Sequence, residues 1–188
     1  MHDLIPQTAL GAATPVIVTR GKLTIRENPD LAFASAAARS GQEAACRNKL
    51  TEWLGQDLPG PGRGAASPDK TAVWMSPDQW LVSTAYAEQD DLATRLSHLL
   101  GPCASVTEQT GAWACFDING GAVVDMFERL CATPVRRMRP QDAQRTIIHH
   151  MGCFVMCHSP AEEFRVLGPR SSAQSLHHAL VAAAESVA

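Results

Sequence analysis

The sequence lacks the features that would assign it at once to a large functional class. Its 16 lysines and arginines nearly balance 19 aspartates and glutamates, so the net charge of -3 offers no basic excess for nucleic acid or an anionic membrane. No apolar run is long enough to span a bilayer. The start, MHDLIPQTAL, has neither the basic nor the apolar region of a signal peptide. We therefore expect a cytoplasmic protein that binds neither nucleic acid nor membrane.

The six cysteines occur without a secretory signal, which favours reduced thiols over a disulfide framework. The 188 residues are enough for one large domain or two small ones. Residues 1–15 carry Pro6, Gly11 and Pro15 and are predicted to form an irregular N-terminal arm. Residues 16–188 are predicted to form a single domain.

The stretch from Ser105 to Cys131 organises the prediction of the fold. Residues 113–118 alternate between two sets of side chains, W-C-D and A-F-I, as in a strand. Asn119-Gly120-Gly121 follows and favours a sharp reversal, because Asn and Gly accept positive φ. An apolar stripe at helical spacing comes next: Val123, Met126, Phe127 and Leu130. A strand, a turn and a helix are predicted in that order.

The other elements follow from the same rules. Strands are predicted at 16–18, 23–25, 71–75, 80–84 and 164–167, and helices at 42–54, from Asp90 or Asp91 to 100, and from Ser171 or Ser172 onward. The proline of Ser76-Pro77-Asp78-Gln79 predicts a type I turn between two strands. Residues 145–159 resemble a strand interrupted at Gly152, and 58–70 a mobile loop.

Residues 31–39 are ambiguous, because their alanines favour a helix but Ser40-Gly41 ends the run early. If they form a strand, the order strand-helix-strand-strand-helix occurs twice. The predicted first helices then begin near residues 42 and 121, 79 residues apart, and the closing helices near 90 and 171, 81 residues apart. We predict an α+β fold with pseudo-duplicated halves, about 16–100 and 103–188, and mainly antiparallel sheets.

Five potential metal ligands lie within ten residues: His149, His150, Cys153, Cys157 and His158. Histidine and cysteine suit zinc, and a thiol near histidine can act as a nucleophile. On a strand, however, Cys153 and Cys157 share a face at about 13 Å, which is too far for one zinc ion. The apolar neighbours favour a buried strand with free cysteines, although a zinc or thiol protein stays open as an alternative.

Three arginines, Arg136, Arg137 and Arg139, lie in a predicted loop and form a local basic patch with Arg145, against one acid, Asp142. Such a patch suits a carboxylate-bearing ligand or an acidic partner, although a solvated loop is an equal interpretation. The sequence shows no catalytic constellation: no Ser-His-Asp order, no paired carboxylates and no nucleophile elbow. We predict no catalytic, cofactor-binding or metal-binding residue in this chain, and the three arginines as partner contacts.

Several segments together resemble one known family. They are Leu58–Pro61, WMSPDQWLV at 74–82, residues 105–130, residues 146–156 and FRVLGPRSSAQSLHHAL at 164–180. In these segments the chain is similar to the gamma subunit of heterotetrameric sarcosine oxidase, whose fold is related to the folate-binding domain of the glycine-cleavage T protein. The resemblance covers most of the chain beyond about residue 16 and supports a strand at residues 31–39.

The resemblance implies a flavoenzyme of four subunits that oxidises the N-methyl group of sarcosine. Its products are glycine, hydrogen peroxide and, with tetrahydrofolate, 5,10-methylenetetrahydrofolate. The partners would be the alpha, beta and delta subunits, which would carry FAD, FMN, NAD, tetrahydrofolate and zinc. The gamma subunit itself is expected to hold no cofactor.

The sequence departs from the folate-binding relatives at one place. They carry an aspartate and then a serine at the end of the strand before the glycine, where this chain has Glu108 and Thr110. Two other interpretations stay open: a free-standing folate-binding one-carbon protein, and the corresponding subunit of an N-methylglutamate dehydrogenase-type complex.

Overall fold

The computed structural model describes residues 6–188 and divides them into two compact units. The terminal unit contains the described residues up to Pro29 together with Ala112–Ala188, and the middle unit is Asp30–Gly111. Both combine helices with antiparallel sheets, so the prediction of an α+β fold is confirmed. None of the helices within residues 6–188 is long and apolar enough to cross a membrane.

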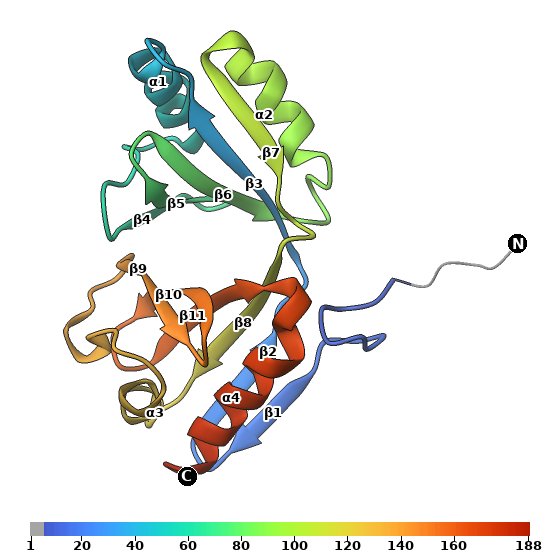
Figure 1. Cartoon of the computed structure of the whole chain (residues 1–188), viewed down its shortest axis with the longest axis vertical. Helices are drawn as coiled ribbons and strands as arrows, with labels where there is room; N and C mark the ends of the chain where they lie inside the picture. The colour runs from blue at the N-terminus through green and yellow to red at the C-terminus, as the bar shows by residue number, and fades with distance from the viewer. Residues whose placement is uncertain (1–5) are drawn as a thin grey trace, which may run out of the picture. The chain divides into compact units, whose positions relative to one another are not determined.

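The terminal unit contains a six-stranded antiparallel sheet in the order β1-β2-β8-β11-β10-β9. Helices α3 and α4 enclose its core, and α4 packs along β1, β2 and β11 (Figure 1). The elements are β1 (Ile17–Arg20), β2 (Leu23–Glu27), β8 (Trp113–Asn119), α3 (Val123–Leu130), η2 (Val135–Arg137), β9 (Ala143–Ile148), β10 (Met151–Ser159), β11 (Glu163–Pro169), η3 (Arg170–Ser172) and α4 (Ala173–Glu185).

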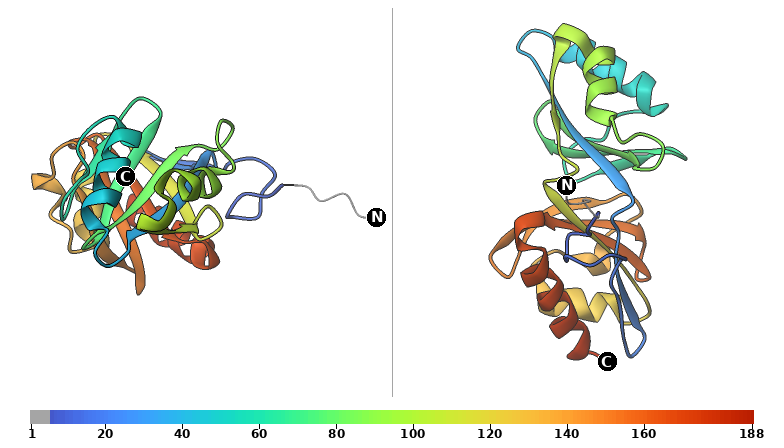
Figure 2. Two further views of the ribbon diagram at one scale, coloured as in Figure 1. Left: turned by 90° about the horizontal axis from the view of Figure 1, so that it is seen from above. Right: turned by 90° about the vertical axis from the view of Figure 1, so that its right-hand side faces the viewer.

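The middle unit contains a five-stranded antiparallel sheet in the order β4-β5-β6-β3-β7. Helices α1 and α2 lie side by side and pack on β3 (Figure 2). Trp80 is fully buried beneath them, and its indole N–H donates to the carbonyl oxygen of Pro59 at 3.0 Å. The elements are β3 (Leu31–Ala38), α1 (Glu43–Leu54), β4 (Gly64–Ala66), β5 (Lys70–Ser76), β6 (Gln79–Ala85), α2 (Leu92–Leu100), η1 (Gly101–Cys103) and β7 (Ala104–Glu108).

The five strands of the middle sheet have counterparts in the terminal sheet, which also contains β1, and in each set of five one strand comes from the other repeat. A first repeat runs from β2 to α2 and a second from β7 to α4. Their first strands begin at Leu23 and Ala104, 81 residues apart, and their closing helices at Leu92 and Ala173, also 81 apart. Yet β2 pairs with β8 of the second repeat, and β7 pairs with β3 of the first. The repeats have therefore exchanged their first strands.

The predicted halves, about 16–100 and 103–188, follow the chain order of these repeats, whereas the compact units do not. The difference has a physical cause: a strand satisfies its backbone groups with whichever partner the fold brings beside it, irrespective of separation along the chain. A single domain over 16–188 stays a prediction. Part of the predicted arm, 1–15, lies outside the described residues, and residues 6–15 form no helix or strand.

The ambiguous segment 31–39 is the strand β3. It is hydrogen-bonded on both sides, to β6 and to β7, and Ala32, Ala34 and Ala36 alternate into the core. The small alanine side chains suit a central strand crossed closely by helices, so tertiary pairing overrides the helical preference of alanine.

Two predicted reversals were wrong in detail. The β5–β6 turn is not type I, because Asp78 has φ +53°, whereas the third residue of a type I turn has negative φ. The break between β9 and β10 falls at His149 and His150, with φ of +47° and +70°, and not at Gly152, which pairs with Ile147 inside the sheet. Two positive φ values are what a tight two-residue hairpin turn requires, even without glycine.

The predicted loop 58–70 contains the three-residue strand β4, which pairs with β5. Asp91 and Ser172 are the N-cap residues of α2 and α4, but neither side chain caps its helix. The Asp91 carboxylate instead accepts from Arg95 one turn later, at 2.5 Å. An ion pair within the first turn thus replaces the predicted cap.

Candidate functional site

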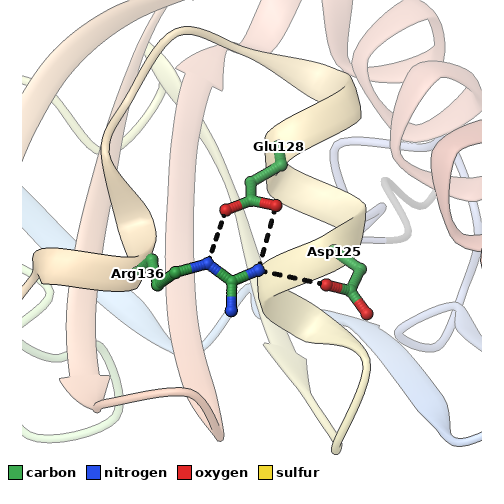
Figure 3. Close-up of polar contacts among 3 residues, drawn as sticks. All are labelled: Asp125, Glu128 and Arg136. Carbon is green, nitrogen blue, oxygen red and sulfur yellow. Dashed lines mark hydrogen bonds and ion pairs between the residues drawn. The ribbon is translucent and has the colours of Figure 1, made fainter.

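Arg136, the first of the three predicted contact residues, is held by two carboxylates of α3 (Figure 3). Its Nε and Nη2 donate to the two oxygens of Glu128 at 2.8 and 3.0 Å, and Nη2 also donates to Asp125 at 3.3 Å. The hydrogen bonds from Arg136 lower the pKa of Glu128. All three side chains are exposed, so water screens the pair and its contribution to stability is small.

Arg137 and Arg139 are also exposed, and neither side chain has an ion-pair partner among residues 6–188. The backbone N–H of Arg139 donates to Asp142 at 2.7 Å, which fixes the loop at its base. The basic patch therefore carries less charge than the sequence indicates. Sequence reasoning missed Asp125 and Glu128, because they approach the loop only through the packing of α3 against η2.

The cysteines and histidines of the His/Cys cluster do not lie together: the cysteines are buried and the histidines are exposed. Cys153 and Cys157 point into the core of the terminal unit, with exposures of 0% and 1%. Desolvation raises the pKa of each thiol to about 11, so both are protonated and unreactive near neutral pH. His149 and His150 occupy the exposed turn, and His158 is exposed. Within residues 6–188 no three metal-ligating side chains converge.

Glu108 and Thr110, the two residues at which the sequence departs from the folate-binding pattern, are engaged in a local turn. The Glu108 carboxylate accepts from the backbone N–H of Thr110 at 2.6 Å. The Thr110 hydroxyl accepts from the N–H of Phe33 at 2.9 Å. The contact between Thr110 and Phe33 joins the segment after β7 to β3. The contact between Thr110 and Glu108 occupies one carboxylate oxygen of Glu108 within the chain.

A half-buried ion pair that sequence reasoning missed joins β11 to β8 in the terminal unit. Arg165 of β11 donates from Nε and Nη2 to the two oxygens of Asp117 of β8, at 2.6 and 3.1 Å. Asn28, directly after β2, donates to Asp117 at 2.6 Å. The two charged side chains are only 17% and 14% exposed. Because Asp117 and Arg165 lie far apart in the sequence, no local sequence pattern indicated that they pair.

A pocket of about 340 Å³ opens in the terminal unit where the C-terminal ends of α3 and α4 meet the β9–β10 turn. Arg129 stands at its edge and donates from Nη1 to the carbonyl oxygen of Ser186. The remaining lining residues are Leu130, His149, His178, Ala179, Ala182 and Ala183. No sequence pattern indicated this pocket, because its residues come from three separate segments.

No family model matches the chain, and no curated protein matches it. Among solved structures, heterotetrameric sarcosine oxidase from Corynebacterium sp. U-96 matches at TM-score 0.77 and 19% identity, over 91% of this chain and 88% of that chain. Aminomethyltransferase T of the glycine cleavage system from Bartonella henselae matches at TM-score 0.66 and 11% identity, over 90% of this chain and 51% of that chain. The chain therefore spans about half of the T protein. It has the fold of a sarcosine oxidase subunit and of the T protein, as the sequence resemblance predicts.

Proposed function

We propose that the chain is the gamma subunit of a heterotetrameric sarcosine oxidase and carries no catalytic residue of its own. The complex would oxidatively demethylate sarcosine to glycine, with hydrogen peroxide and, in the presence of tetrahydrofolate, 5,10-methylenetetrahydrofolate as further products. The observation that carries the proposal is the extent of the fold match, which includes nearly the whole of this chain and of a chain in such an oxidase. The shorter overlap with the T protein favours it further.

The placement of the reactive groups supports a non-catalytic role. The thiols of Cys153 and Cys157 are buried and protonated, and Arg136 is bound by carboxylates. Glu108 is engaged by Thr110, which does not favour a folate site at this position. We assign FAD, FMN, NAD, tetrahydrofolate and zinc to the alpha, beta and delta subunits, and the complex to the cytoplasm.

Affinity purification of the tagged chain from its native cell extract tests the proposal. We expect a complex that shows flavin absorbance, contains three further subunits by mass spectrometry, and forms peroxide when sarcosine is added. A complex that oxidises N-methylglutamate instead would assign the chain to that related class of dehydrogenase. A colourless chain recovered alone would contradict both subunit assignments.

The fold of the T protein favours one alternative, a free-standing folate-binding one-carbon protein. Calorimetric titration of the isolated chain with tetrahydrofolate decides it. Saturable binding that Glu108→Gln weakens would favour the alternative. If no heat change accompanies the titration, the folate interpretation is excluded for this chain.

A further inference from the structure

The pocket beside α4 combines an apolar floor with a rim of hydrogen-bond donors. Leu130, Ala179 and Ala183 form half-buried parts of the wall. Arg129, His149 and His178 stand around the opening, and within the described residues no carboxylate side chain lines it. The rim is complementary to acceptors and negative charge, and the floor to an apolar side chain.

The pocket is too open for a small ligand to be its natural occupant. Five of its eight lining residues are exposed: Arg129, His149, His178, Ala182 and Ser186. Small-molecule sites bury most of the ligand surface, which a pocket of about 340 Å³ with such walls does not do. When a partner protein inserts one apolar side chain into such a pocket, by contrast, the surrounding surface of the partner covers the side chain from outside.

The outward face of α4 has the composition of a covered surface. Its exposed positions are Gln174, Ser175, His178, Ala182 and Glu185, and Glu185 is paired with Arg20 at 2.8 Å. A helix that faces water ordinarily carries several charges on its outer side. Depletion of charge is instead typical of the centre of a protein interface.

We propose that this pocket is a docking site for a partner subunit, which inserts one apolar side chain and places carboxylates against Arg129, His149 and His178. The inference rests on the proposed function, because it deepens the subunit assignment by locating a contact. It also places the contact on the end of α3, on α4 and on the β9–β10 turn, whereas the sequence-predicted arginines of the η2 loop do not line the pocket.

Filling the pocket tests the inference. The tagged full chain and its variant Ala182→Trp are recovered from native cells, and the partner bound per chain is measured by flavin absorbance and mass spectrometry. We expect at least about a tenfold loss of partner, the scale of one anchor residue. Asn48→Trp is the matched control, because it adds the same side chain at an exposed position of helix α1, outside both the pocket and the outward face of α4. Equal thermal melting of the isolated chains excludes misfolding.

A photocrosslinker identifies the occupant directly. p-Benzoylphenylalanine at position 182 should crosslink to a partner peptide in which an apolar residue adjoins Asp or Glu, whereas the same group at position 48 should not crosslink to that peptide. Full assembly of Ala182→Trp, a crosslink to a second copy of this chain, or no crosslink in an intact complex would each overturn the inference. If isovalerate binds saturably and Ala182→Trp abolishes that binding, the inferred occupant of the pocket is a small carboxylate and not a partner subunit.

The two proposals fail in different ways. A wild-type complex without flavin or sarcosine oxidation contradicts the proposed function, while the crosslink from position 182 still decides the docking site. A flavin-bearing complex that oxidises sarcosine and includes Ala182→Trp at wild-type levels contradicts only the docking site. A wild-type chain recovered alone contradicts both.

Discussion

Gly120 lies where the turn after β8 comes closest to the β1–β2 hairpin. It has φ +128°, and a Cβ built there would lie 1.9 Å from the carbonyl oxygen of Lys22. Only glycine combines this backbone conformation with so close an approach. Gly121 next to it has no atom within 4 Å of the corresponding position. The Asn119-Gly120-Gly121 sequence therefore places one essential glycine beside one that is not constrained by packing.

Gly120→Ala is expected to lower the free energy of unfolding by about 3 kcal/mol or more, because the backbone of Lys22 must move away. Urea denaturation followed by tryptophan fluorescence measures the change. Gly121→Ala is the control and should lie close to wild type. Equal urea midpoints for the two variants would mean that the β1–β2 hairpin moves away from the added Cβ at little cost in free energy.

His177 of α4 stacks on Phe116, with ring centroids 5.7 Å apart, and its Nε2 is buried without a hydrogen-bond partner. Desolvation lowers the pKa of His177 below its usual value of 6.5. The unfolded chain then binds a proton more readily than the folded chain, so stability falls as the pH drops below about 6.5. Unfolding at several pH values should show this loss.

His177→Gln should reduce the slope of that part of the pH profile, because it removes one of the two histidines whose pKa desolvation lowers, His158 being the other. His98→Gln, at an exposed position of α2, is the control and should keep the slope. An unchanged slope in His177→Gln would assign the pH dependence to other groups.

At the scale of elements, the exchanged strand β2 is fastened to the rest of the terminal unit by polar contacts as well as by its ladder to β8. Asn28 reaches Asp117, and Asp117 binds Arg165 of β11 through two hydrogen bonds. On the opposite side of the strand end, the buried Glu27 carboxylate accepts the backbone N–H groups of Leu10 and Val16 at 2.9 and 3.1 Å. These contacts hold β2 and the segment before it in one register.

Asp117→Asn leaves Arg165 largely buried without its charged partner, so we expect a loss of about 3 kcal/mol in the free energy of unfolding. Asp125→Asn, in the exposed pair with Arg136, is the matched control and should have a much smaller effect. Chemical denaturation compares them. Similar losses of unfolding free energy in both variants would show that partial burial of the Asp117–Arg165 pair contributes little to stability.

At the scale of the whole molecule, the two repeats depend on each other through their exchanged strands. A chain cut between Gly101 and Pro102 leaves the first fragment without β7 to pair with β3, and the second without β2 to pair with β8. Unpaired edges of central strands promote aggregation or exchange between copies.

We therefore expect each fragment expressed alone to aggregate or form exchanged dimers, and the co-expressed fragments to associate one to one. Size-exclusion chromatography with light scattering measures these states. A stable, folded monomer of either fragment alone would show that strand exchange is not required for folding.

The sequence by itself determined most of the local structure. Alternation in residues 113–118 and the apolar stripe from Val123 to Leu130 specify a strand and a helix, because one face of each must be buried. The constant spacing of the helices indicated the duplication, and the family resemblance predicted the fold that the solved structures share.

Only the tertiary structure decided which strands pair and which charges remain available. The local sequences of β2 and β7 do not indicate which strands they pair with, because the same backbone hydrogen bonds form with any partner strand. The pairing of Arg136 with Glu128, the pairing of Asp117 with Arg165, and the pocket beside α4 all join segments that are separate in sequence. Local patterns report burial and periodicity, whereas sites and interfaces depend on the distances that packing sets between remote residues.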